Sequence, residues 1–154
     1  MIDATEARRR LQALLEEEST LVLCTAGETP WGAPLFYVPG RDGVLHWLSS
    51  PRSRHSLELA VRPEVAVAIH GSTFRWEEIR GAQLEGVAGI VDEPAERARL
   101  LAAYRARFDL GPTFEEAIAR SVLYRFVPTR ARLLDNALGF PGKVEIVFGQ
   151  PAGE

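Results

Sequence analysis

The feature that most constrains the fold is a succession of short apolar segments, most of them bounded by glycine or proline turns. Segments of this length that are rich in β-branched and aromatic residues are typical of β-strands. They lie at residues 20–25, 33–38, 44–48, 65–70, 81–91, 122–127, 131–134 and 144–148. Short turns join the first three, which predicts an antiparallel meander. The glycines within 81–91 predict a bend or bulge in that strand.

Two segments in the first half of the chain have the apolar spacing of helices. The first begins after a cap at Asp3 or Thr5 and is expected to bury four residues: Ala7, Leu11, Leu14 and Leu15. The second is short and ends at Pro63. Its predicted inner face consists of Leu57, Ala60 and Val61.

Two more helices are predicted between strands 81–91 and 122–127. Pro94 opens the first. Its expected apolar side consists of Ala98, Leu101, Tyr104 and Phe108. Thr113 and Glu116 have the spacing of a capping box, which predicts that the second begins at Thr113. Many short strands with a few outer helices indicate a small closed barrel rather than a doubly wound parallel sheet.

Length and composition exclude several classes of protein. The 154 residues fit one domain spanning 1–154. No apolar run approaches the roughly 20 residues that cross a bilayer, and a net charge of −3 argues against a protein that coats nucleic acid. The N-terminus lacks the order of a secretion signal, and the single Cys24 excludes an intramolecular disulfide, so a cytoplasmic location is expected. The spacing of His46 and His70 predicts no metal site.

The stretch 48–56, Leu-Ser-Ser-Pro-Arg-Ser-Arg-His-Ser, leads from a predicted strand into a predicted helix. The first turn of a helix has unpaired N–H groups and the positive end of the helix dipole, so it can bind an anion such as phosphate. Arginine side chains would add charge-assisted hydrogen bonds. The alternative is structural: Ser50 or Ser53 caps the helix and the arginines point into solvent.

Two sets of residues carry a resemblance to a known family. Ser53-Arg54-His55 followed by Arg62-Pro63-Glu64-Val65 resembles the phosphate turn and helix end of the flavin-binding split barrels, the superfamily of pyridoxamine phosphate oxidase. Asp135-Asn136-Ala137-Leu138-Gly139-Phe140, followed by Lys143, is similar to a signature of one small uncharacterised branch, which also has Phe-Tyr-Val where this chain has 36–38. The resemblance implies a mainly β (α+β) fold: a six-stranded antiparallel split β-barrel with flanking helices.

The resemblance also implies a homodimer that binds FMN at the subunit interface. Ser49, Ser53, Arg54 and His55 would hold the phosphate and ribityl chain, and backbone groups of Leu35 and Phe36 would face the isoalloxazine ring. The other implied cofactor-binding positions are Tyr37, Leu48 and, reaching the flavin from the partner subunit, Gln83. Val38 replaces a basic residue of the oxidase, so pyridoxamine phosphate is not expected to bind in the oxidase's manner.

The expected function is that of a flavin-dependent oxidoreductase whose substrate and electron donor the sequence does not name. The alternatives are a flavin binder or sensor without turnover, and a split barrel that binds the deazaflavin F420 or haem instead. Two interpretations of Asp135 and Asn136 stay open. They form a turn before the last strand, or they position Phe140 and Lys143 near the flavin of the neighbouring subunit. Cys24 is expected to be a buried small hydrophobe.

Overall fold

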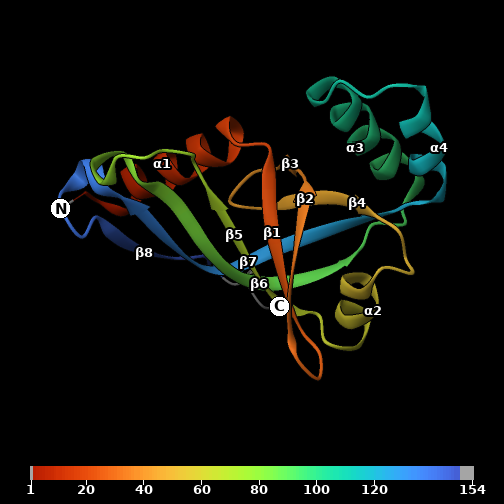
Figure 1. Cartoon of the computed structure of the whole chain (residues 1–154), viewed down its shortest axis with the longest axis horizontal. Helices are drawn as coiled ribbons and strands as arrows, with labels where there is room; N and C mark the ends of the chain where they lie inside the picture. The colour runs from red at the N-terminus through yellow and green to blue at the C-terminus, as the bar shows by residue number, and fades with distance from the viewer. Residues whose placement is uncertain (1, 150–154) are drawn as a thin grey trace.

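The computed structural model describes residues 2–149 (Figure 1). One antiparallel sheet of eight strands is its main element, with the order β2-β1-β5-β6-β7-β4-β3, and β8 also pairs with β7. The strands are β1 (Thr20–Ala26), β2 (Pro30–Phe36), β3 (Val38–Pro39), β4 (Leu45–Ser49), β5 (Glu64–His70), β6 (Arg80–Ile90), β7 (Val122–Asp135) and β8 (Lys143–Val147). The predicted antiparallel split barrel is thus confirmed, with eight strands instead of six.

The prediction of a meander over the first three strands is wrong. β1 pairs with β2, but β4 pairs with β7, and β2 lies at the opposite edge of the sheet from β3 and β4. The chain crosses between these edges at Tyr37, whose ring is fully buried and whose hydroxyl donates to the Leu15 carbonyl at 2.6 Å. The sheet therefore curls so that its two edges are joined by one residue of the chain.

A bulge lies beside the glycines of β6, where one was predicted, but its extra residue is on the neighbouring strand β7. The register between β6 and β7 shifts at Glu85/Gly86, where Glu85 pairs with Arg130 and Gly86 pairs with Pro128. Thr129 is the extra residue on β7, and its hydroxyl donates to the Glu85 carbonyl. Such a bulge bends the strand and increases its twist. Predicted segments 122–127 and 131–134 are accordingly one continuous bent strand.

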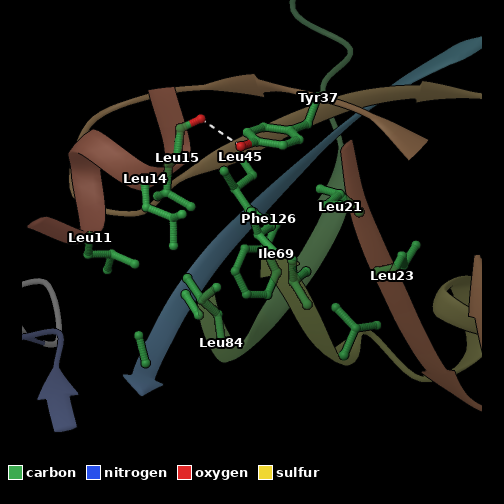
Figure 2. Close-up of a cluster of buried hydrophobic side chains, with 14 of the residues drawn as sticks. Leu11, Leu14, Leu15, Leu21, Leu23, Tyr37, Leu45, Ile69, Leu84 and Phe126 are labelled. Carbon is green, nitrogen blue, oxygen red and sulfur yellow. Dashed lines mark hydrogen bonds between the residues drawn. The ribbon is translucent and has the colours of Figure 1, made fainter. Parts of the chain in front are cut away.

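Helix α1 (Ala4–Glu17) closes one side of the barrel (Figure 1). The Asp3 side chain caps it by accepting from the Glu6 N–H, and the four predicted apolar residues are its buried residues. They pack on the inward side chains of the sheet, some of which Figure 2 shows: Leu21, Leu23, Leu45, Ile69, Leu84 and Phe126. The core therefore lies between α1 and the concave side of the sheet.

The other helices differ from prediction in the faces that they bury. α2 (Arg54–Val61) buries His55, Ser56 and Leu59, whereas Leu57 and Val61 are exposed. α3 (Pro94–Arg107) buries Leu100 and Tyr104 but not Ala98. α4 (Pro112–Arg120) begins after Gly111 with Pro112 in its first turn, and no side chain caps it, so Thr113 is not its cap. None of the described helices is long and apolar enough to cross a membrane.

Helix α3 covers part of the outer face of the sheet. Leu100 packs there with Val91, Leu123 and Leu48 in a small second core. The rest of the outer face, over β1, β5, β6 and the middle of β7, has no helix on it in Figure 1. That uncovered face is where outward side chains such as Cys24 and Gln83 lie.

Candidate functional site

The phosphate turn predicted from sequence is a tightly closed segment between β4 and α2. The Ser53 N–H and hydroxyl both donate to the Ser50 carbonyl, at 3.1 and 2.8 Å, and the Arg52 N–H donates to the Ser50 hydroxyl. Ser53 is the N-cap of α2 and accepts from the Ser56 N–H. Its capping role is thus confirmed. Within residues 2–149, the N–H groups of Arg54 and His55 make no hydrogen bond, as expected for the first turn of a helix.

His55 links the two serines of this turn. Its Nε2 atom lies 2.7 Å from Ser49 Oγ and 3.1 Å from Ser53 Oγ. Ser49 and His55 are both buried. Burial lowers the pKa of His55 below its ordinary value, so the imidazole is neutral at pH 7 and one ring nitrogen carries the proton. The group can therefore offer a hydrogen bond to an anion, while its cationic form is disfavoured.

The Arg54 side chain leads away from the serines to the β1–β2 hairpin. Its Nε atom is 2.5 Å from Glu58 Oε1, Nη2 is 2.9 Å from Thr29 Oγ1, and the guanidinium lies 4.2 Å from the centre of the Trp31 ring. Glu58 also accepts from Thr25. Glu58 was not among the predicted site residues, although its i,i+4 spacing from Arg54 is a known signal for an ion pair. The guanidinium charge is thus shared with a carboxylate of its own helix.

The side chains of the four residues predicted to lie near the flavin ring differ in burial, and they come from β2, the residue after it and β4. Leu35 packs against the core, whereas the Phe36 ring is partly exposed and stacks on Phe108 at 4.4 Å. The Tyr37 side chain is fully buried, which leaves only its backbone for contact with a ligand. Leu48 is half-buried beneath α3, against the small second core. Of these four side chains, only Phe36 presents a substantial surface to solvent.

Gln83 is separate from the phosphate turn within one chain. It lies on the outer face of β6, between Ala68 of β5 and Arg132 of β7. A hollow of about 340 Å³ surrounds it, whose lining includes Cys24, Ala66, Arg130 and Arg132. Cys24 is partly exposed there, so the prediction of a buried cysteine is wrong. The described residues contain no cluster of three His, Cys, Asp or Glu side chains that would hold a metal.

The Asp-Asn signature makes a structural turn at the far end of the barrel. Asp135 is held by Arg10 at 2.9 Å and accepts from the Ala137 N–H. Asn136 donates through its backbone N–H to the Ile79 carbonyl and through its side chain to the Trp76 carbonyl. These bonds join two short 3₁₀ helices, η1 (Trp76–Glu78) and η2 (Asn136–Leu138). The turn interpretation is thereby confirmed for Asp135 and Asn136.

An exposed aromatic tip lies on this turn and consists of Phe74, Trp76 and Phe140. Trp76 and Phe140 meet edge to face at 5.7 Å, and Phe140 is 76% exposed. Phe74 is fully exposed. Within one chain, the tip and the phosphate turn are at opposite ends of the sheet: η1 leads into Arg80, the first residue of β6, whereas α2 leads into Glu64, which pairs with Val87.

Comparisons with known proteins agree with this architecture. The family model of pyridoxamine 5'-phosphate oxidase matches residues 7–135. A UPF0306 protein of Photorhabdus laumondii is 30% identical over 146 residues, which cover 93% of this chain and 97% of the relative.

Two solved structures resemble the fold. A conserved hypothetical protein of Mycobacterium tuberculosis has a TM-score of 0.74 at 22% identity, covering 99% of this chain and 96% of that one. The haem storage protein of Vibrio cholerae has a TM-score of 0.64 at 20% identity, covering 78% and 88%. With its antiparallel split barrel and a family match over residues 7–135, the chain belongs to the pyridoxamine 5'-phosphate oxidase family.

Proposed function

We propose that the protein binds FMN as a homodimer, with the phosphate held at the Ser49–His55 turn, and acts as a flavin-dependent oxidoreductase. The observation that carries the proposal is the combination, at one helix start, of Ser49, Ser53, the buried His55 and the two N–H groups of Arg54 and His55, which make no hydrogen bond in the described part of the chain. A phosphate accepts several hydrogen bonds and favours the positive end of a helix dipole. Bound FMN would supply the hydride or electron transfer, and the chain would supply binding and orientation.

The chemistry of the donors fits a phosphate. The N–H groups of Arg54 and His55 are fixed by the cap at Ser53, so their orientation costs little entropy on binding. The Arg54 Nη1 atom has no partner in the described part of the chain, although Nε and Nη2 are engaged. The guanidinium can therefore donate to an anion without losing its contact with Glu58. The ion pair then serves to hold the arginine at the rim of the site.

The first test is a titration of the purified apo-protein with FMN and, separately, with riboflavin, which lacks the phosphate. We expect FMN to bind at least about tenfold more tightly, because the phosphate alone meets the helix start. Flavin fluorescence and the visible spectrum measure both affinities. Equal affinities for FMN and riboflavin would remove the phosphate role of the turn. Reduction of bound flavin by a nicotinamide donor would favour an enzyme over a non-catalytic binder or sensor.

Replacing Arg54 by alanine tests the contribution of the guanidinium. Loss of one charge-assisted contact is expected to weaken FMN binding by about 1.5–3 kcal/mol, while riboflavin affinity changes little. The matched control is Glu58→Gln, which leaves Arg54 in place without its ion pair and is expected to retain FMN binding. Thermal unfolding of both variants reports whether the hairpin contact with Trp31 is needed for folding. An Arg54→Ala variant that is folded and keeps full FMN affinity would contradict the assignment.

Haem is the second candidate ligand. It is supported by the similarity to the haem storage protein of Vibrio cholerae and by His70, an exposed histidine whose Nδ1 lies 2.8 Å from the Gly71 carbonyl. A hydrogen bond from Nδ1–H would leave Nε2 free to ligate iron. Addition of haemin with a readout of the Soret band separates this candidate from flavin. The spectrum of added F420 tests the remaining cofactor in the same way.

A further inference from the structure

A hollow of about 540 Å³ lies between helix α1, the turn that joins β3 to β4, and the residues that follow β8. It is here called the α1 hollow. Its lining comes from three parts of the chain that are distant in sequence, within 8–16, at 41–43 and at Phe148. It shares no lining residue with the phosphate turn or with the hollow around Gln83, and α1 lies well apart from α2 in Figure 1. The α1 hollow is therefore separate from the site already described.

Phe148 forms one wall of the α1 hollow and is held from three sides. Its N–H donates to the Thr129 carbonyl at 3.1 Å. The guanidinium carbon of Arg8 lies 5.0 Å from the centre of its ring. The ring also approaches Gly43 closely, because a Cβ atom at Gly43 would lie 3.0 Å from Phe148 Cζ. The aromatic wall is thus formed before any ligand binds, which lowers the entropy that binding costs.

The β3–β4 turn forms a second wall of fixed shape. The residue after Gly43 donates its N–H to the Arg41 carbonyl at 3.0 Å, and φ is positive at both central residues, 52° at Asp42 and 76° at Gly43. These are the features of a tight type I′ turn, for which Asp-Gly is a favoured pair. The Gln12 side chain of α1 donates to the Gly40 carbonyl at 2.9 Å. The helix and the turn are therefore tied together around the hollow.

Two arginines of the α1 hollow, Arg8 and Arg41, form no ion pair within residues 2–149. Arg8 donates from Nη2 to the Val147 carbonyl at 2.5 Å, and its other guanidinium nitrogens make no hydrogen bond in that part of the chain. The Arg41 side chain makes none there at all. Arg9, by contrast, is bound by Glu6 at 2.7 Å. The guanidiniums of Arg8 and Arg41 therefore have donors left for charge-assisted hydrogen bonds to an anion.

Two carboxylates limit the negative charge that the α1 hollow can accept. Glu16 and Asp42 also line it, and among the described residues neither forms an ion pair with Arg8 or Arg41. A dianion such as phosphate would be repelled by both carboxylates. A single carboxylate meets half of that repulsion and matches the planar fork of a guanidinium. The charges therefore favour a ligand with one carboxylate.

The apolar part of the lining favours a ligand with a planar ring. Leu11 is buried, and the Phe148 ring is half-buried against the core. An aromatic ligand ring can stack on such a ring in an offset or edge-to-face arrangement. The volume of the hollow also lies within the range of small-molecule sites, roughly 300–1,000 Å³, in which a few polar groups orient a ligand on apolar walls.

We propose that the α1 hollow binds a small aromatic carboxylate, with its carboxylate on the guanidiniums of Arg8 and Arg41 and its ring on Phe148. This second ligand site needs neither the phosphate turn nor FMN. Titration with FMN tests the proposed function, and titration with an aromatic carboxylate tests the α1 hollow. The failure of either proposal is therefore recognised without reference to the other.

Titration of the isotope-labelled protein with phenylpropionate at neutral pH tests the site, with NMR chemical shifts as the readout. We expect saturable shifts of the backbone N–H signals of Gly43 and Phe148, with a Kd of about 1 mM or tighter. Propionate lacks the ring, phenylpropylamine carries an ammonium group instead of the carboxylate, and phenyl phosphate carries a second negative charge. Each is expected to bind in the hollow at least about tenfold more weakly. Equal affinity for any of the three would overturn the proposed class of ligand.

Arg41→Ala and Arg8→Ala test the two guanidiniums. Each variant is expected to bind phenylpropionate at least about tenfold more weakly, because a charge-assisted contact is lost. The matched control is Arg62→Ala, which removes an exposed arginine outside the hollow that forms no ion pair within residues 2–149. The spectrum of each variant without ligand shows whether it is folded. Wild-type affinity in both folded arginine variants, or the absence of saturable shifts at the hollow, would mean that Arg8 and Arg41 are only solvated surface charges and would overturn the proposal.

Discussion

Gly86→Ala is expected to destabilise the fold by about 3 kcal/mol or more, because no space exists for a side chain at this position. A Cβ atom there would lie 2.2 Å from the Val127 carbonyl oxygen and 2.8 Å from two atoms of the Phe126 ring. The first obstacle is backbone of the neighbouring strand, and the second is a fully buried core residue. Neither can move without separating β6 from β7 at the bulge.

Urea unfolding monitored by tryptophan fluorescence measures this loss. The matched control is Gly89→Ala, three residues further along the same strand, where an added Cβ meets nothing within 4 Å. The free energy of unfolding of Gly89→Ala is expected to lie within about 0.5 kcal/mol of the wild-type value, since no contact changes and alanine restricts the unfolded chain. If both variants lost the same stability, the cause would be the strand propensity of alanine and not the close approach of β7.

The elements that local pattern determines were predictable from sequence. α1 buries the four residues that its 3.6-residue period selects, and the pairing of β6 is irregular beside Gly86, although the extra residue of the bulge lies on β7. Sheet order was not predictable in the same way. β4 follows β2 after a short stretch, yet it pairs with β7, about 75 residues further along the chain. Nothing in the residues of β4 itself specifies so distant a partner.

The buried face of α2 was not predictable from hydrophobicity alone. The large apolar residues of α2 are Leu57, Leu59 and Val61, but only Leu59 is buried and Val61 is 88% exposed. His55 and Ser56 are buried instead. The turn at Ser50–Ser53 sets the rotation of the helix, because Ser53 must cap it and His55 must reach Ser49. Hydrogen bonding at the helix start thus decides which side of α2 faces inward, and it leaves Leu57 and Val61 exposed.

The residue types of the candidate site were predictable from sequence, but the directions in which their side chains point were not. The turn places Ser49, Ser53 and His55 together as expected. The direction of Arg54 depends on Glu58 and on Trp31 of a hairpin that is distant in sequence. The hollow around Gln83 is lined by residues of five strands, β1, β5, β6, β7 and β8, and could be located only once the sheet order was known. Tertiary contacts of this kind leave no periodic signal in the chain.

We expect the protein to become markedly less stable as the pH falls below neutrality, because His46 is buried in its neutral form. It lies buried on β4, and its Nε2 accepts from Arg125 Nε at 3.1 Å, while Arg125 Nη2 binds Glu96 on α3 at 2.5 Å. Its Nδ1 is buried and makes no hydrogen bond within residues 2–149. Burial, followed by the charge of Arg125, lowers the pKa of His46 to about 4. A protonated ring would face the guanidinium that it now accepts from.

The direction of this pH effect follows from which state of the chain, folded or unfolded, binds a proton at His46 at the higher pH. The unfolded chain takes up a proton at this histidine near pH 6.5, and the folded chain does so only near pH 4. Stability from the neutral ring is therefore complete above pH 6.5 and declines as the pH falls toward 4, by roughly 3 kcal/mol in total. The lowered pKa of His55 adds a loss in the same direction.

Urea unfolding at pH 7.5, 5.5 and 4.5 of the wild type and His46→Gln isolates this contribution. Glutamine keeps a hydrogen-bonding group at the site but does not titrate, so the variant is expected to lose less stability on acidification than the wild type. The difference between the two free energies of unfolding should therefore shift in favour of the variant as the pH falls. Curves that stay parallel from pH 7.5 to 4.5 would mean that His46 is protonated as readily in the folded chain as in the unfolded one. In that case the contact between Arg125 and Glu96 would hold α3 on the sheet without help from a neutral histidine.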